Sequence, residues 1–585
     1  MLGIYIKSLT KSYTILSADL KKKFLFNQFL VLITSLVDLF GFAVFIPVFS
    51  MLFDSDIFTE NIYLLKLRFF LNINDDGKFQ ILILFLALLV FFIRSMFIIY
   101  SLTIQKKFAL NVSEFIGNKL YSYYLSLDFL SFSNLDRSKI LRELTISPSN
   151  FAKHIINPLL LLISEIFIIL FIVIGMAIYD SKAFLLIFLT LVPAAFFFQK
   201  MVKKRIKTLG EKMNDLSPSF YENSLRGVYA YTDVRLRVKE KSIINDYNLT
   251  FEKLNILGLK STILNFLPSK LFELIAVIGV VLIFIYSKLF QNDLLSSIKL
   301  LSIYLAASYK VIPSLSKVIP SLMSLEQYSY LFDIYRKPFS KSNVNYKPSI
   351  GKLEIQNYIE LNNIYFSFKN KKIFEDFSLR IPKGEMLGVI GKSGVGKTTL
   401  INIIAGLISP DEGGILIDGN LLKISEINKW YLNVAYVKQE PYLEKGNLIN
   451  NIAFLDDDFD IDRVNKAAKM ASLDDLINGE NIENIKIEEF GKNLSSGQKQ
   501  RIIIARALYN NCDLILFDES TSALDVKTEG RIVEIFKELK KQNVTVIIVA
   551  HRFSTLKHTD RIIELEEIGI KNILSYSDLK TKELL

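Results

Sequence analysis

A chain of 585 residues is too long for one ordinary domain, and apolar residues make up 51% of it, which is high for a soluble protein. The formal net charge is +11, but the basic residues are spread through the connections between apolar segments, so no nucleic-acid partner is expected. The single cysteine, Cys512, excludes an intrachain disulfide framework.

The first half of the chain contains six apolar segments that are long enough to cross a bilayer. A helical span needs about 20 mostly apolar residues. An amphipathic stretch from Gly3 to Phe24 precedes them without the features of a signal peptide, so the first span is expected to stay attached. The predicted spans lie at residues 27–53, 79–104, 155–179, 183–202, 267–289 and 297–325.

Two long connections between these segments, residues 105–154 and 203–266, are polar and helical in their periodicity. In the second connection basic residues outnumber acidic ones, which places it in the cytoplasm by the positive-inside rule. We therefore expect helices that extend beyond the membrane on the cytoplasmic side.

The composition changes between residues 337 and 353, where the chain becomes polar and contains Pro338 and Pro348. This predicts a transmembrane domain at residues 1–336, a linker at 337–353 and a second domain at 354–585. The second domain alternates helical stretches with short β-branched runs, the pattern of an α/β fold. These predicted strands are Met386–Ile390, Val434–Val437, Leu514–Phe517 and Thr545–Val549.

A glycine-rich sequence that fits a phosphate-binding loop follows the first of these strands and opens a helix. Glycines let backbone N–H groups curl around phosphate oxygens at a helix N-terminus, Lys397 is expected to reach the β and γ phosphates, and the Thr398 hydroxyl to ligate magnesium. A glycine-rich turn without a ligand is the alternative. The predicted ATP-binding residues here are Gly391, Lys392, Ser393, Gly394, Val395, Gly396, Lys397, Thr398 and Thr399.

Two adjacent acids follow the buried run Leu514–Phe517. Asp518 is expected to organise the magnesium shell, and Glu519 to act as the general base that polarises the attacking water. An ordinary strand followed by a turn would look the same in isolation, but its distance from the phosphate loop favours an ATPase site. The predicted fold is therefore a multidomain one, an all-α six-helix transmembrane domain followed by an α/β P-loop ATPase domain.

Between these motifs the sequence from Leu494 to Arg501, LSSGQKQR, resembles the signature motif of ATP-binding-cassette (ABC) proteins. In that family the motif opens a helix that faces the γ-phosphate of ATP held by the opposite subunit. The resemblance implies that Ser495, Gly497 and Gln498 contact ATP. Ser496 replaces the commoner glycine, a change expected to modify hydrolysis without abolishing it.

Three further positions match the family's pattern in order along the chain. Gln439 resembles the residue that couples magnesium to the membrane domain, and His551 the histidine that contacts the γ-phosphate. Phe368 stands where the family has an adenine-stacking aromatic, although a core phenylalanine is an alternative. Because no catalytic position is replaced by an inert residue, a homodimer with two equivalent sites is expected, with ATP and Mg²⁺ as cofactors.

Six helices fused before one cassette resemble the exporter type of ABC half-transporter. Segments near Ser131–Arg137 and Leu225–Arg235 are candidate coupling helices. The resemblance implies a multi-pass protein of the bacterial cytoplasmic membrane with its nucleotide-binding domain in the cytoplasm.

Ionisable residues within the spans are the only indication of the cargo, because each is costly at membrane depth. Arg94, Lys310 and Lys317 could hold an anionic head group, and their surroundings resemble those of bacterial flippases for lipid-linked oligosaccharides. Alternatively these bases pair internally with acids such as Asp38 and Glu165. Membrane lipid and an amphipathic or lipid-linked cargo are the expected partners, and an exporter of drugs or peptides is the alternative.

Overall fold

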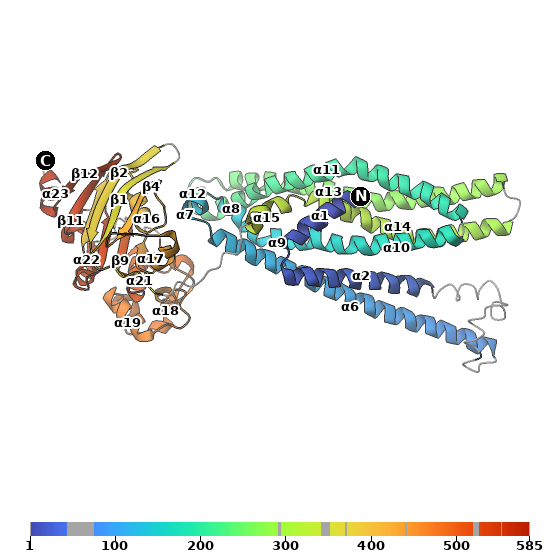
Figure 1. The fold of residues 1–585 in the computed structure, drawn as a ribbon, viewed down its shortest axis with the longest axis horizontal. Helices are drawn as coiled ribbons and strands as arrows, with labels where there is room; N and C mark the ends of the chain where they lie inside the picture. The colour runs from blue at the N-terminus through green and yellow to red at the C-terminus, as the bar shows by residue number, and fades with distance from the viewer. Residues whose placement is uncertain are drawn as a thin grey trace. The chain divides into compact units, whose positions relative to one another are not determined.

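The computed structural model describes residues 2–43, 69, 75–179, 181–290, 294–340, 351–368, 371–438, 441–518, 526–550 and 553–583. The chain divides into two compact units (Figure 1). The first comprises Met1–Leu127 and Asn134–Val344, and the second comprises Asp128–Ser133 and Asn345–Leu585. The first unit is helical and the second contains the sheets, which confirms the predicted fold class.

Each of the six predicted spans falls on a long helix of the first unit, although residues 44–53 of the first span lie outside the described residues. Among the described residues, four stretches are long and apolar enough to cross a membrane: Ala18–Phe40, Gly77–Leu125, Ser147–Ile178 and Glu240–Ile285. The helices of this unit are α1 (Leu2–Ile15), α2 (Ala18–Ala43), α6 (Asp76–Leu125), α8 (Arg137–Thr145), α9 (Ser147–Phe151), the π-helical turn η1 (Ala152–Ile156), α10 (Asn157–Tyr179), α11 (Ser181–Tyr229), α12 (Tyr231–Leu236), α13 (Glu240–Phe290), α14 (Leu294–Gln327) and α15 (Leu331–Ser340).

The long helices continue well past the apolar segments, as the periodicity of the connections predicts. Helix α6 has 50 residues, which corresponds to about 75 Å, more than twice the thickness of the apolar core of a bilayer. Helices α11 and α13 are of similar length and pack against each other, while α2 pairs with α6. Each predicted coupling segment overlaps a short helix, α7 (Phe129–Ser133) in the first and α12 in the second.

Helices α11, α13 and α14 meet at Gln327, which is almost completely buried. The Ser261 hydroxyl on α13 donates to Gln327 Oε1 at 3.0 Å. On α11, a Cβ at Gly210 would lie 1.9 Å from the Gln327 carbonyl oxygen, so only glycine allows this approach. Gln327 therefore joins α14 to α13 through a side-chain hydrogen bond and to α11 through a close approach of the two backbones.

Helix α15 differs from the sequence prediction at the start of the linker. It continues to Ser340, four residues into the segment predicted as a linker from residue 337. Pro338 is buried on the same face as Leu331, Phe332 and Tyr335. Packing of this face stabilises a helix that the proline alone would not favour.

The second unit is built on two main sheets. The larger has the strand order β12-β11-β3-β10-β9-β6, parallel except for β12, and the smaller is antiparallel with the order β2-β1-β4-β5. The strands are β1 (Tyr358–Phe368), β2 (Lys371–Pro382), β3 (Met386–Gly391), β4 (Glu412–Ile417), β5 (Asn420–Leu421), β6 (Val434–Val437), β7 (Gly446–Asn447), β8 (Lys486–Ile487), β9 (Leu514–Asp518), β10 (Thr545–Val549), β11 (Arg561–Glu566) and β12 (Gly569–Leu574).

All four strands predicted from β-branched runs are present, and they form the centre and one edge of the larger sheet. The side chains of β3, β9 and β10 are mostly buried on both faces, as expected for parallel strands covered by helices, whereas those of the edge strand β6 are half-buried except Val437. The helices of this unit include α16 (Lys397–Ile404), α17 (Ile427–Tyr431), α18 (Leu448–Ile452), α19 (Ile461–Met470), α20 (Asp474–Ile477), α21 (Ser496–Tyr509), α22 (Val526–Lys541) and α23 (Tyr576–Glu583), with α7 assigned to it as well.

The approach of α11 to α14 gives a first prediction. Gly210→Ala places a methyl group against the Gln327 carbonyl and should destabilise the helical unit by about 1–3 kcal/mol through overpacking. Thermal unfolding of the purified chain in detergent measures this loss. Gly258→Ala on α13 is the matched control, because a Cβ there has no neighbour within 4 Å. Equal melting of the two variants would contradict the role assigned to Gly210.

Candidate functional site

The predicted phosphate loop connects the end of β3 to the start of α16, as the sequence pattern requires. Its backbone turns through three glycines with positive φ, at +151° for Gly391, +79° for Gly394 and +112° for Gly396. A Cβ at Gly396 would also lie 2.7 Å from the Ile373 side chain. Larger residues would therefore strain the loop and, at Gly396, clash with Ile373.

Lys397 begins α16, and its side chain folds back over this loop. Its ammonium donates to the carbonyl oxygens of Gly391 at 2.8 Å and Lys392 at 3.1 Å. Only 6% of Lys397 is exposed. The loop thus holds a positive charge over the helix N-terminus, whose own dipole also favours an anion. Ser393 and Val395 lie in the loop, and Thr399 lies in the first turn of α16.

Thr398 and Asp518 are separated by 120 positions in sequence and meet at this site. The Thr398 hydroxyl donates to Asp518 Oδ1 at 3.4 Å, and the Tyr436 hydroxyl donates to Asp518 Oδ2 at 2.9 Å. Burial and the charge of Asp518 raise the pKa of Tyr436, so Tyr436 stays a donor at neutral pH. A hydroxyl and a carboxylate oxygen side by side are hard ligands of the kind that magnesium prefers.

The three other predicted catalytic or metal residues, Gln439, Glu519 and His551, lie outside the described residues. The strands that precede them in the chain are β6, β9 and β10, which are adjacent and parallel. Their roles stay predictions. Tyr436 was not predicted, because its contact with Asp518 depends on the order of the strands, which no local pattern reveals.

Phe368 is the last residue of β1 and is 43% exposed. This exposure argues against the alternative of a core phenylalanine. Its role in stacking against adenine remains a prediction.

The signature sequence forms the start of helix α21. Ser495 is the N-cap, and it exchanges hydrogen bonds with Gln498, Ser495 N donating to Gln498 Oε1 at 2.9 Å and Gln498 N to Ser495 Oγ at 3.2 Å. Gly497 is buried in the first turn, whereas Ser495 and Ser496 are exposed. The helix therefore presents a capped, accessible N-terminus.

An ion pair that the sequence did not predict joins helix α21 to helix α20. Arg501, only 2% exposed, donates to both carboxylate oxygens of Asp475 at 2.7 and 2.9 Å. Arg531 donates to the same carboxylate at 2.9 Å. Hydrogen bonds from Arg501, followed by those from Arg531, hold the pKa of Asp475 well below its usual range.

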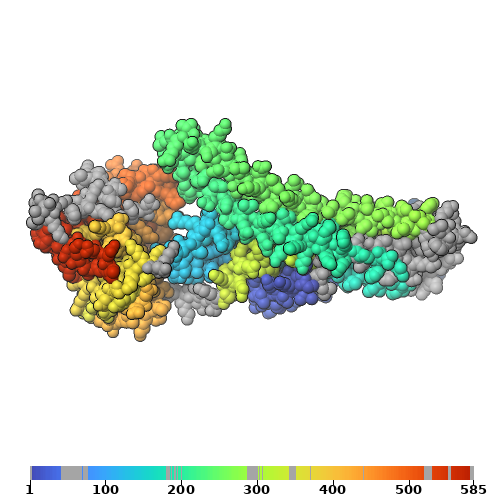
Figure 2. Space-filling view, turned by 90° about the horizontal axis from the view of Figure 1, so that it is seen from above, coloured from blue at the N-terminus to red at the C-terminus, as the bar shows by residue number. Residues whose placement is uncertain are grey.

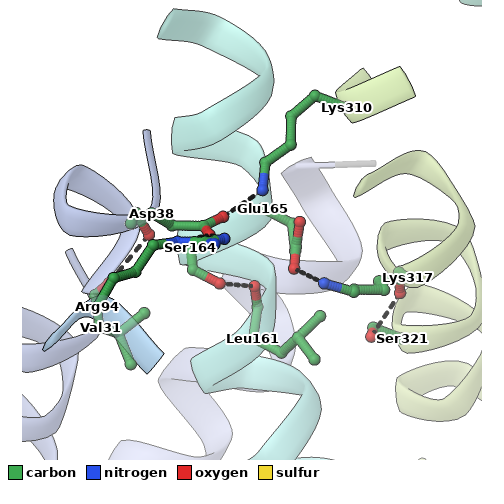
Figure 3. Close-up of polar contacts among 10 residues, drawn as sticks. Val31, Asp38, Arg94, Leu161, Ser164, Glu165, Lys310, Lys317 and Ser321 are labelled. Atoms are coloured by element: carbon green, nitrogen blue, oxygen red, sulfur yellow. Dashed lines mark hydrogen bonds and ion pairs between the residues drawn. The ribbon is translucent and has the colours of Figure 1, made fainter. Parts of the chain in front are cut away.

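The three candidate cargo residues are engaged with acids inside the helical unit (Figure 3). Asp38 on α2 lies between Arg94 on α6 and Lys310 on α14 and forms an ion pair with each. Lys317 donates to Glu165 on α10 at 2.7 Å. The structure thus contains the internal ion pairs that were one of the two alternatives for these bases. One carboxylate faces two cations at Asp38, so this cluster keeps one positive charge.

Comparison with known proteins agrees with this geometry. Residues 374–522 match the family model described as ABC transporter. The alpha-hemolysin translocation ATP-binding protein HlyB of Proteus vulgaris is 41% identical over 223 residues, 37% of this chain and 31% of that protein. The leukotoxin translocation ATP-binding protein LktB of Mannheimia haemolytica is 39% identical over 225 residues, 38% and 32% of the two chains. The chain therefore matches about a third of the length of these relatives.

A solved structure extends the similarity to both units. A bacterial Atm1-family ABC exporter with ATP bound superposes with a TM-score of 0.77 and 21% sequence identity, covering 97% of this chain and 98% of that one. The chain therefore has the fold of an ABC exporter, a helical membrane domain followed by a nucleotide-binding domain.

The anchoring of α21 gives a second prediction. Asp475→Asn leaves the buried Arg501 without a full counter-charge and should cost about 1–3 kcal/mol, less than a fully buried pair because 37% of the Asp475 side chain is exposed. Thermal unfolding of the full chain checks this loss. Because the folded pKa of Asp475 is depressed, the difference from the parent should persist above the unfolded value of about 3.9 and diminish as pH falls from there toward the lower folded pKa. Asp457→Asn, at an exposed acid in the same unit, is the control.

Proposed function

We propose that this chain is one half of a homodimeric exporter of the bacterial cytoplasmic membrane that uses ATP hydrolysis to move an amphipathic cargo. The observation that carries the proposal is the meeting of Thr398 and Asp518 at a phosphate loop closed by Lys397. The match to the ABC transporter family model and the exporter fold support it.

The hydrolysis step follows from the residues of this edge of the sheet. The loop N–H groups and Lys397 hold the phosphates in line with an attacking water, whose proton passes to Glu519 as its oxygen bonds to the γ-phosphorus. The bond from that phosphorus to the bridging oxygen breaks, leaving ADP and phosphate. Thr398, Asp518 and Gln439 would hold Mg²⁺, which neutralises charge on the phosphate oxygens when bound.

Two copies of the chain would complete each site. The accessible N-terminus of α21, with Ser495 and Gly497, would contact the γ-phosphate bound to the opposite copy, and His551 would contact it from the same copy as the loop. ATP would then hold the two nucleotide-binding domains together, and its hydrolysis would release them. Motion passed to the helical unit through short helices such as α7 and α12 would alternate access to the cargo site.

The cargo favoured by the sequence is a lipid-linked oligosaccharide or a related lipid, bound through its phosphates by Arg94, Lys310 and Lys317. In its support, the Asp38 cluster keeps one positive charge, and Lys317 is 55% exposed despite its contact with Glu165. Against it, every one of these bases has an acid partner, which reduces the charge available to a ligand.

A second candidate cargo is a peptide or protein. It is favoured by the relatives, two of which are named for the translocation of hemolysin and leukotoxin. Drugs belong to the same alternative class, for which the paired bases would serve the structure of the helical unit alone.

The catalytic role of Glu519 is tested by Glu519→Gln, which removes the general base and keeps the shape. Steady-state phosphate release should fall about 100-fold or more, while ATP binding is retained and the bound nucleotide stays as unhydrolysed ATP. Glu567→Gln, at an exposed acid between β11 and β12, should leave turnover unchanged. Normal turnover of Glu519→Gln would overturn the assigned role.

The cargo proposal is tested by removing the three candidate bases together with the acids that they contact. The variant carries the neutral substitutions Arg94→Gln, Lys310→Gln, Lys317→Gln, Asp38→Asn and Glu165→Gln. Because bases and acids are removed together, no buried charge is left without a partner. If the bases bind the cargo phosphates, this variant should lose flipping of a pyrophosphate-linked lipid in liposomes and keep its basal ATPase activity.

The outcome separates the two cargo classes. Retained flipping in the charge-free variant would reject the phosphate-binding role and leave the bases as structural ion pairs. Lys270→Gln/Glu273→Gln is the matched control, since this pair joins at 2.9 Å on the surface of α13. It should flip lipid as the parent chain does.

A further inference from the structure

A cavity of about 690 Å³ lies within the helical unit, between the N-terminal helix α1, the middle of α11 and the junction of α14 with α15. Helix α1 packs against α14 and α15, and in Figure 2 the N-terminal residues, in blue, lie against the yellow-green residues of these helices. All of the residues that line the cavity belong to the first unit. The cavity is separate from the Asp38 cluster and from the phosphate loop.

One wall of the cavity is basic because of the spacing of lysines on two helices. Lys200, Lys203 and Lys207 follow one another at intervals of three and four on α11, which places them on one helical face. Lys7 and Lys11 are four apart on α1 and line the same cavity. Two basic stripes from segments far apart in sequence therefore face one space.

The lining of the cavity also contains carboxylates, but they do not cancel this charge. Glu211 pairs with Lys207 at 3.8 Å, and Glu326 and Asp333 complete the acidic groups of the lining. Among the described residues, no carboxylate forms an ion pair with Lys7, Lys200 or Lys203. The five lysines and three carboxylates of the lining leave a surplus of positive charge.

The position of the cavity along α11 connects it with the membrane surface. Phe196 lines one end of the cavity and is 65% exposed, and the preceding turns of α11 expose Leu185, Phe188 and Leu189. The lysines begin one turn later, at Lys200. Apolar exposed side chains followed at once by lysines are typical of the boundary between the bilayer core and the head groups, on the basic, cytoplasmic side.

We propose that this cavity binds the head group of an anionic phospholipid from the cytoplasmic leaflet. The phosphate would lie between the lysines of α1 and α11, where several ammonium groups converge, and the acyl chains would follow the exposed apolar face of α11. The lipid would tie α1 to α11 and act as a structural ligand, not as cargo. This proposal requires the chain to span a membrane, but it does not depend on the cargo or on ATP hydrolysis.

The test is a lipid titration of the purified full-length chain in detergent, followed by native mass spectrometry. Phosphatidylglycerol should bind, and phosphatidylcholine with the same acyl chains should bind at least about tenfold more weakly. Lys7→Gln/Lys200→Gln/Lys203→Gln should weaken phosphatidylglycerol binding by about tenfold or more. Lys22→Gln/Lys204→Gln/Lys212→Gln removes the same charge from exposed positions nearby that do not line the cavity, and should bind as the parent does.

Three results of the binding experiment would overturn the proposal. They are equal binding by the two triple variants, no preference for phosphatidylglycerol over phosphatidylcholine, and full competition by soluble glycerol phosphate, which would assign the cavity to a free phosphate compound. Gel filtration and thermal unfolding of the cavity variant without added lipid should match the parent, because the three lysines are exposed in the folded chain. A cavity variant that melts early even without lipid would assign these lysines to folding and likewise reject the proposal.

Discussion

The parallel register of β3, β10 and β9 is the constraint on which the candidate ATPase site depends. Val549 of β10 is paired with Val389 of β3 on one side and with Asp518 of β9 on the other. Parallel strands end at the same edge of a sheet, so the phosphate loop after β3 and the carboxylate at the end of β9 emerge together. A change of strand order would separate Thr398 from Asp518 even if every motif residue were kept.

The sequence predicts the parts of this site that are encoded locally. Four strands of the larger sheet, the glycine loop and the helix at the signature sequence were all expected, because each depends on residues within a few positions of one another. The Tyr436 hydroxyl on Asp518 and the Asp475 carboxylate beneath Arg501 were not expected. Both contacts join segments whose neighbourhood is decided by strand order and helix packing, which a single sequence does not reveal. Helix α15 passes Pro338 for a related reason, since burial of its apolar face outweighs a local preference.

The ionisable residues of the helical unit illustrate the same limit. Their positions within the apolar segments are visible in the sequence, but their partners depend on the rotation of each helix about its axis. Asp38 meets Arg94 and Lys310 on two other helices, and Glu165 meets Lys317. A buried charge without a partner is so costly that pairing is the first expectation wherever an opposite charge is within reach. Basic residues in a span are therefore better evidence for how the helices pack than for which cargo is transported.

The two groups of basic residues in the helical unit differ in what they can offer to an anion. A ligand at the Asp38 cluster must compete with a carboxylate that is already in contact, which offsets part of the charge of Arg94 and Lys310. At the cavity beside α1, Lys7, Lys200 and Lys203 keep their charge partly hydrated and make no ion pair among the described residues. An incoming phosphate there displaces water instead of a carboxylate, and it approaches from a surface where anionic lipid is already concentrated. A resident lipid is therefore easier to accommodate at the cavity than an anionic cargo is at Asp38, and the number of basic residues near a site is a poorer guide to its ligand than the number of carboxylates already engaged with them.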